Sequence, residues 1–194
     1  MEIIQRDKYN MIFTADVRDT IFQKDIFQFY KDYNKPFLGI FLEDNIISGE
    51  GLNIAWTNFY CGDLNIKHNQ IVCIGTLLGT VDKFIEFSKA LWQMVGEKND
   101  INIAREQGAA NCLIYGKQIL KDYIITKDNH GPVMTICLTK RELINLDNNN
   151  NILNFDGQIA AVIHQYDRKV DITQKIQIHV DLPELSDRIA IFKV

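Results

Sequence analysis

Apolar residues form strand-length runs in the first part of the chain. The first run spans residues 10–16 and ends at Asp16, and two more span residues 36–42 and 70–75. Short apolar runs bounded by polar residues and glycines are typical of buried β-strands. We therefore predict three strands here, the first of which places carboxylates at its carboxyl end.

From Thr80 the spacing of the apolar positions becomes that of an amphipathic α-helix. The predicted apolar face consists of Val81, Phe84, Ile85, Phe87, Ser88, Leu91, Trp92 and Val95. Thr80 is a suitable N-cap, because its hydroxyl can accept a hydrogen bond from a backbone N–H of the first turn. A second helix is predicted over residues 103–115, ending at Gly116. Its inward positions are Ala109, Ala110, Leu113 and Ile114.

Three more apolar runs, over residues 122–126, 133–138 and 160–164, predict strands in the last third of the chain. The polar stretch 147–151 between them is typical of a solvated turn. Strands that alternate with two substantial helices predict an α/β fold, in which helices flank a layered mixed sheet. We expect one domain over residues 1–194, with a core over about 10–170 and a C-terminal extension over 171–194.

Composition and charge narrow the classes of protein. The 194 residues are 46% hydrophobic and 24% charged, which is typical of a single globular domain. The formal net charge of −4 gives no broad basic surface for nucleic acid, so no nucleic-acid partner is expected. No apolar run reaches the roughly 18–20 residues that a membrane span requires, so no membrane span is expected either.

The four cysteines, Cys61, Cys73, Cys112 and Cys137, show no CxxC spacing. Each lies among apolar or small residues, as buried thiols commonly do. We therefore predict reduced thiols in the core rather than disulfides or a zinc site.

Asp16 and Asp19 bracket Arg18 where the first predicted strand ends. Carboxylate oxygens in such a position can hold a divalent cation against a phosphate group. The same three residues could instead form a solvated turn with an Asp–Arg ion pair. The motif alone leaves both interpretations open.

His164 ends the last predicted strand and is followed by Gln165 and, three positions later, Arg168. One imidazole together with two carboxylates suits Mn²⁺ better than Ca²⁺ or Mg²⁺. A metal ion that bridges two phosphates would stabilise a departing diphosphate. The alternative is that His164 is a structural residue that only makes hydrogen bonds.

Two further segments carry candidate chemistry. Glu106 and Gln107 open the second helix with a carboxylate and a carboxamide, a combination that commonly grips sugars but also serves in ordinary helix caps. Gly75 and Thr76 begin a predicted strand–loop–helix junction, where glycines would let a substrate approach the backbone. This junction lacks the lysine of a P-loop.

Taken in order, these blocks resemble a group of metal-dependent glycosyltransferases with a GT-A-type fold. The blocks are residues 13–27, 75–80, 106–115, 131–133 and 163–168, and the resemblance covers roughly residues 10–170. It implies that Asp16 and Asp19 hold the metal ion and the phosphates of the donor nucleotide, and that His164 completes the metal site. The helix block of this family commonly begins Asp-Gln, whereas this chain has Glu106-Gln107.

The expected function is transfer of a sugar from a nucleoside-diphosphate sugar to a hydroxyl acceptor on a glycan or protein. Mn²⁺ or Mg²⁺ would be the cofactor, and Glu106 and Gln107 would orient the sugar or the acceptor in catalysis. Candidates for substrate contacts by position are Arg18, Gly75, Thr76, Gln165 and Arg168. A metal-dependent phosphohydrolase would explain the carboxylates but not the Glu106 helix or the Gly75 segment.

The competing class is a non-catalytic or partner-dependent fragment that acts as a sugar-binding or accessory module. In a complete GT-A domain a nucleotide-binding half precedes the metal motif, yet here the motif begins at Asp16. We therefore expect an exposed apolar face where the absent half would pack, since such faces usually mark interfaces. A homodimer or a partner chain is the expected occupant of that face.

Overall fold

The computed structural model describes residues 9–62, 65–98 and 105–176, which form a mixed α/β fold. The larger sheet has the strand order β1-β4-β3-β5, and the smaller sheet has the order β2-β9-β6. The strands of the larger sheet are β1 (Met11–Ala15), β4 (Gln70–Thr80), β3 (Leu38–Ile46) and β5 (Ile124–Lys127). Those of the smaller sheet are β2 (Thr20–Phe22), β9 (Val162–His164) and β6 (Val133–Thr135).

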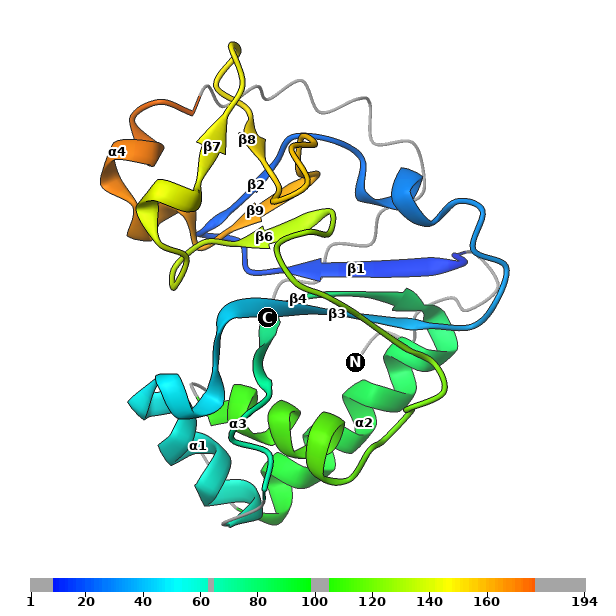
Figure 1. The fold of residues 1–194 in the computed structure, drawn as a ribbon. Coiled ribbons are helices and arrows are strands. Elements are labelled where there is room, and N and C mark those ends of the chain that lie inside the picture. The colour runs from blue at the N-terminus through cyan, green and yellow to red at the C-terminus, as the bar shows by residue number, and fades with distance from the viewer. Residues whose placement is uncertain (1–8, 63–64, 99–104, 177–194) are drawn as a thin grey trace.

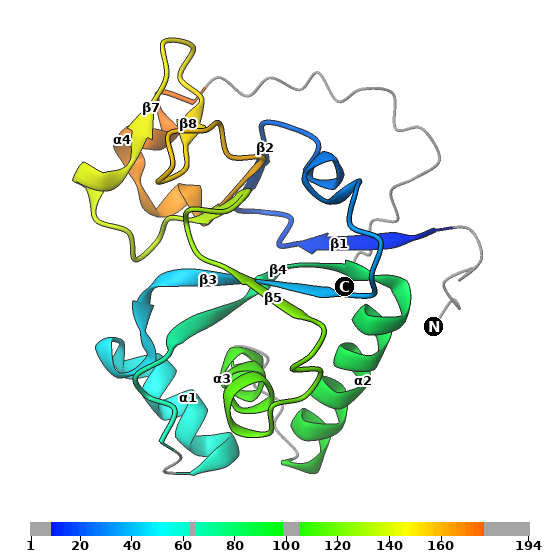
Figure 2. The ribbon, with the colours of Figure 1, turned by 45° about the vertical axis from the view of Figure 1, so that its right-hand side comes forward.

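Helices cover one face of the larger sheet, and the smaller sheet lies beyond its other face (Figures 1 and 2). The helices are α1 (Gly51–Cys61), α2 (Val81–Glu97) and α3 (Glu106–Asn111), with the short α4 (Val170–Thr173) beside the smaller sheet. β7 (Asn145–Leu146) and β8 (Ile152–Leu153) form a hairpin whose turn is the polar stretch predicted from the sequence. Asp147 holds that turn by accepting hydrogen bonds from the backbone of Asn149 and Asn151.

Both faces of β3 are buried, which explains its continuous apolar run. Leu38, Ile40 and Leu42 belong to the cluster shared with the helices. Phe37 and Phe41 belong to the cluster shared with the smaller sheet. A strand covered on both sides has no polar face, so its sequence does not alternate.

All six strands predicted from apolar runs are present, but the segment after Gly75 differs from the prediction. Residues 75–80 were expected to form a loop, whereas β4 continues through them to Thr80. The reason is that β1 pairs with this part of β4, from Ala15 opposite Thr76 to Met11 opposite Thr80. Against β3, the register of β4 shifts between Leu77 and Cys73, so β4 bulges at Gly75.

The first helix, α1, was not predicted from the sequence. Its buried positions are Asn53, Thr57 and Tyr60, whereas Leu52 on its outer side is exposed. Because two of its three buried residues are polar, apolar periodicity did not reveal the helix. Glu50 caps it, accepting a hydrogen bond from the backbone N–H of Asn53 at 2.7 Å.

The helix α2 begins where the sequence predicted, but two details differ. The hydroxyl of Thr80 does not cap the helix; it bonds to the backbone of Phe37 on the neighbouring strand. Trp92 was placed on the inner face but is 80% exposed, and Met94 is buried instead. Leu91 and Val95, at the same end of α2, do pack against the core as predicted, so the prediction is wrong only for Trp92 and Met94.

The second predicted helix is present as α3, which continues as a π-helix over Cys112–Gly116. Its predicted start at residue 103 lies outside the described residues. The four inward positions, Ala109, Ala110, Leu113 and Ile114, are buried as expected. Gly108 lets α3 approach α1 closely, since a Cβ there would lie 2.5 Å from the carbonyl oxygen of Trp56.

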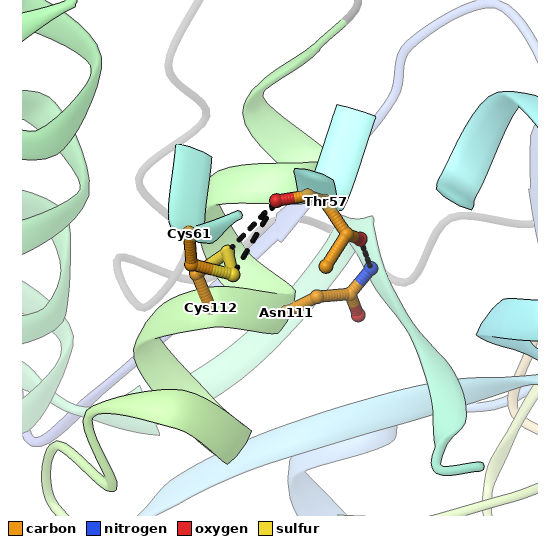
Figure 3. The surroundings of a disulfide bond; sticks show 4 residues. All are labelled: Thr57, Cys61, Asn111 and Cys112. Carbon is orange, nitrogen blue, oxygen red and sulfur yellow. Dashed lines mark hydrogen bonds between the residues drawn. A yellow bond between two sulfur atoms is a disulfide. The ribbon is translucent and has the colours of Figure 1, made fainter. Parts of the chain in front are cut away.

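The prediction of four reduced cysteines is wrong for two of them. Cys61 at the end of α1 and Cys112 after α3 form a disulfide, with their Cα atoms 5.9 Å apart (Figure 3). The carbonyl oxygen of Thr57 lies 3.3 Å from Sγ of Cys61 and 3.4 Å from Sγ of Cys112. Sequence spacing could not show this pairing, because the packing of α1 against α3 brings the two sulfurs together. Cys73 and Cys137 are free thiols, as predicted.

In the described part of the chain, no helix is long and apolar enough to cross a membrane. Apolar side chains that are more than half exposed there lie on separate segments, namely Val17, Leu52, Trp92 and Val170. The expected apolar interface with a second copy or a partner stays a prediction.

Reduction of the disulfide should destabilise the protein. The bond closes a loop with a sequence separation of 51 residues, for which chain entropy gives about 4 kcal/mol. In urea unfolding, we expect the free energy of unfolding measured with dithiothreitol to be lower by this amount than that of the oxidised protein. The double variant Cys61→Ser/Cys112→Ser should match the reduced protein and not respond to dithiothreitol. An unfolding midpoint that dithiothreitol leaves unchanged in the unmodified protein contradicts the bond.

Candidate metal centre

Three chain segments bring Asp16, Asp19 and His164 together where the two sheets meet. Asp16 directly follows β1, and its backbone N–H donates to the carbonyl oxygen of Gly75 at 2.9 Å. Asp19 directly precedes β2, whose first residue pairs with His164 on β9. The carbonyl oxygen of Asp19 accepts a hydrogen bond from the backbone of Gln165 at 2.7 Å. Backbone hydrogen bonds therefore position both acidic residues against the strand end that carries His164.

The side chains of this cluster have the geometry of a candidate metal site. Nε2 of His164 lies 3.2 Å from Oδ2 of Asp16 and 3.7 Å from Oδ1 of Asp19. One ligand atom from each of the three residues lies within 4.8 Å of the others. His164 and Asp19 are buried, whereas the side chain of Asp16 is 61% exposed. The cluster is therefore open to solvent on the Asp16 side.

The donor set fits a first-row divalent ion. One imidazole nitrogen and two carboxylate oxygens are ligands that Mn²⁺ accepts well. Three protein ligands would also leave coordination positions of the ion open for oxygens of a substrate. The expectation that Asp16, Asp19 and His164 share one site thus agrees with their placement, and the identity of an ion stays a proposal.

Gly75 provides the space for this cluster. A Cβ at position 75 would lie 2.4 Å from Cε1 of His164 and 2.5 Å from Oδ2 of Asp16. Real Cβ atoms do not approach other atoms so closely, so any larger residue would push the two side chains away from the strand. The sequence nominated Gly75 as a substrate contact, and the structure places it directly against two of the three candidate ligands.

The second ring nitrogen of His164 contacts Cys73. Nδ1 lies 3.2 Å from Sγ of Cys73, which is completely buried on β4. A histidine that binds a metal through Nε2 carries its proton on Nδ1, where it can donate to a neighbouring acceptor. Cys73 thus holds the ring in the orientation that presents Nε2 to Asp16 and Asp19. Sequence analysis missed this role, since it treated Cys73 only as a core thiol.

The surroundings of His164 favour its charged form. Burial lowers its pKa, but the hydrogen bonds to Asp16 and Cys73 and the charge of Asp19 outweigh burial and raise the pKa to about 10. The metal-free site therefore holds an imidazolium at neutral pH. Binding of a metal ion must displace that proton, because a metal ligand uses the neutral imidazole.

The remaining candidates from the C-terminal motif lie around the cluster. Nη2 of Arg168 is 3.7 Å from Oδ2 of Asp19, and its Nη1 is 2.8 Å from Oδ2 of Asp167. The exposed Arg18 is 3.9 Å from the same oxygen of Asp167. Gln165 has a left-handed backbone, with φ of 58°, which turns the chain sharply after β9. Arg168 thus contacts the cluster through Asp19, and both guanidinium groups pair with Asp167.

Several buried polar atoms near the cluster lack a partner within the described residues. They include Oγ1 of Thr20, Oγ1 of Thr76 and Oε1 of Gln165. Thr76 is completely buried next to Gly75. Buried polar groups are normally satisfied, so such atoms are candidates for contacts with a ligand or with water.

Gln107 belongs to a second polar group rather than to the metal cluster, and Glu106 precedes it as the first residue of α3. Nε2 of Gln107 donates to Oε1 of Glu43 at 3.1 Å and to Oδ1 of Asn53 at 3.0 Å. Asn53 in turn donates from its side chain to Glu50 at 2.9 Å. This group joins the start of α3 to the start of α1 and to β3 at Glu43.

Glu43 is the functional candidate that the sequence analysis missed. Its side chain is buried, and burial is the main reason that its pKa is raised to about 7. The charge of Glu50 also raises this pKa, whereas the hydrogen bond from Gln107 and the charge of His164 lower it. Its position directly after the apolar run 36–42 was the available signal. An acidic residue directly after an apolar run also identified Asp16, although Asp16 follows its strand whereas Glu43 lies within β3.

Comparisons of the chain with protein-family models, with curated proteins and with solved structures found no match. The site is therefore interpreted from its own geometry and chemistry. The two features that carry this interpretation are the cluster of Asp16, Asp19 and His164 and the group around Glu43.

Asp16→Asn should lower the pKa of His164. The substitution keeps the size of the side chain but removes the charge that favours the imidazolium, so we expect a fall of about one unit or more. An NMR titration of the histidine rings in EDTA measures it. His130, whose pKa is raised by its hydrogen bond to Asp156, provides the internal control and should not change. An unchanged His164 titration contradicts the contact with Asp16.

Proposed function

We propose that this chain is a metal-dependent glycosyltransferase, which moves a sugar from a nucleoside-diphosphate sugar to a hydroxyl acceptor. The observation that carries the proposal is the cluster of Asp16, Asp19 and His164 within 4.8 Å, partly open to solvent and flanked by Arg168. In this proposal the mixed α/β fold is of the GT-A type, and Mn²⁺ or Mg²⁺ is the cofactor.

The chemistry of the leaving group supports the proposal. A diphosphate carries several negative charges when it departs, and a bound divalent ion offsets them. Arg168 adds positive charge beside Asp19, Arg18 pairs with the same Asp167 as Arg168, and guanidinium groups are suited to phosphate oxygens. Asp16 and His164, which both lie against Gly75 of β4, would hold such an ion together with Asp19.

The second polar group supports binding of a sugar. Carboxylates and carboxamides that are fixed by one another can donate to and accept from the hydroxyl groups of a pyranose. Gln107, Asn53 and Glu43 are linked in this way at the start of α3. Glu106 precedes Gln107 on the same helix, so both residues keep the role of orienting the sugar or the acceptor.

Calorimetric titration with UDP-, GDP- and related sugars in the presence of Mn²⁺ tests the donor site. We expect binding that EDTA abolishes and that Asp16→Ala weakens at least tenfold, since a metal ligand is lost. Asp16→Ala and Asp19→Asn should also remove metal-dependent turnover while circular dichroism stays unchanged. Turnover retained in both variants contradicts the proposal. Donor binding without any transfer favours the accessory module instead.

Gly75→Ala should weaken binding of Mn²⁺ by at least about tenfold, because the added methyl group displaces His164 and Asp16. The matched control is Gly96→Ala on α2, where a Cβ meets no atom within 4 Å. Titration of Mn²⁺ followed by electron paramagnetic resonance measures both variants. Equal affinity in the two variants contradicts a metal site at this position.

A further inference from the structure

Arg18 and Arg168 come from the two chain segments that carry the candidate metal ligands. Arg18 lies between Asp16 and Asp19 in the connection from β1 to β2, and Arg168 lies in the turn that follows β9. The pairing of β2 with β9 places these two segments side by side. Two remote parts of the sequence thus each contribute one arginine at the same end of β9.

The carboxylate of Asp167 pairs with both arginines. Its Oδ2 accepts a hydrogen bond from Nη1 of Arg168 at 2.8 Å and lies 3.9 Å from Nη2 of Arg18. Its Oδ1 is buried and accepts no hydrogen bond within the described residues. In the described part of the chain, the ion pairs of this carboxylate are therefore those with the two arginines.

Arg168 connects Asp167 to the metal cluster. Its Nη2 is 3.7 Å from Oδ2 of Asp19, whereas its Nη1 is closer to Asp167, at 2.8 Å. Arg168 would lose its attraction to Asp19 once that carboxylate binds a divalent ion, because the ion and the guanidinium carry like charges. Asp167 would then be the carboxylate that keeps Arg168 beside the cluster.

The contacts of Asp167 contribute little to folding. Both arginines are exposed, and ion pairs of exposed groups add little to stability. A buried carboxylate oxygen without a hydrogen-bond partner is unfavourable in the folded protein. Groups that stability alone does not favour are typical of functional sites. The arrangement of Asp167 therefore indicates a role in binding a ligand.

We propose that Asp167 is a positioning residue, which holds Arg168 and Arg18 in place to bind phosphate oxygens next to the metal ion. This inference rests on the proposed glycosyltransferase function and adds a residue that the sequence analysis did not single out. A guanidinium group has five N–H donors in a fixed plane, so it can bind Asp167 and an oxyanion at the same time. An arginine that is already held loses less conformational entropy when the ligand binds.

Binding of inorganic pyrophosphate in the presence of Mn²⁺, measured by calorimetry, tests the inference without knowledge of the donor sugar. Asp167→Asn keeps the size of the side chain but removes its charge. Loss of a negative charge would by itself strengthen the binding of an anion. We expect the opposite, a Kd that rises by about five- to tenfold, because the arginines are no longer held by a charge-assisted hydrogen bond. Asp167→Ser serves as a second variant if Asp167→Asn does not fold.

A double-mutant cycle shows whether Asp167 acts through Arg168. Arg168→Ala should itself weaken binding of pyrophosphate, and Asp167→Asn should then change the remaining affinity by less than about twofold. The affinity for Mn²⁺ alone, measured by electron paramagnetic resonance, should stay within about twofold in Asp167→Asn, because Asp167 is not one of the candidate ligands.

The matched control is Asp171→Asn. Asp171 also pairs with an arginine, but its partner is Arg141 rather than Arg18 or Arg168. The substitution therefore removes the same charge and the same kind of ion pair from a neighbouring part of the chain. Its Kd for pyrophosphate should equal that of the unmodified protein. Circular dichroism of both variants shows that the fold is kept.

The outcomes separate this inference from the function on which it rests. Absence of Mn²⁺-dependent pyrophosphate binding in the unmodified protein overturns both. Binding that Asp167→Asn leaves unchanged or strengthens overturns the role of Asp167 and leaves the glycosyltransferase proposal standing. The role of Asp167 is also overturned if Asp167→Asn weakens binding of Mn²⁺ alone, or if its effect on pyrophosphate is the same with and without Arg168.

Discussion

The close contact between His164 and the backbone of β4 at Gly75 is the constraint on which the candidate site depends. Because position 75 has no side chain, the imidazole and Asp16 can both lie against the strand. The bulge of β4 and the hydrogen bond from Asp16 to the Gly75 carbonyl place the end of β1 at the same point. The pairing of β2 with β9 then brings Asp19 beside His164. The absence of a Cβ at position 75 thus allows three candidate ligands, carried by segments of both sheets, to lie close together.

The helical side of the molecule holds the second polar group by different means. The disulfide between Cys61 and Cys112 ties α1 to the segment after α3. Between these helices, Asn111 donates to Thr57 and accepts from the backbone of Val72, so α3 is also tied to β4. Gln107 at the start of α3 is therefore held on a rigid support. Such a support is what a site needs to keep Glu43 and Asn53 in fixed positions.

Two buried titratable groups have pKa values shifted by opposing influences. The pKa of His164 is raised because nearby Asp16 and Asp19 favour its charged form more than burial opposes it. The pKa of Glu43 is raised because burial disfavours its charge, with one carboxamide and His164 in partial compensation. The first arrangement suits exchange of a proton for a metal ion, and the second suits transfer of a proton near neutral pH.

The sequence by itself determined six of the nine strands of the described residues, because buried strands require apolar runs that any tertiary arrangement must respect. It also placed Asp16 and His164 at strand ends, but it did not reveal the short β2, which Asp19 directly precedes. It did not reveal α1, whose buried face includes Asn53 and Thr57, because polar residues satisfied by other helices leave no apolar period. Likewise, the disulfide, the place of Gly75 and the hydrogen bond of Glu43 each depend on a neighbour remote along the chain. Those contacts were decided by the packing of helices and sheets, because only the folded backbone sets the distances between such segments.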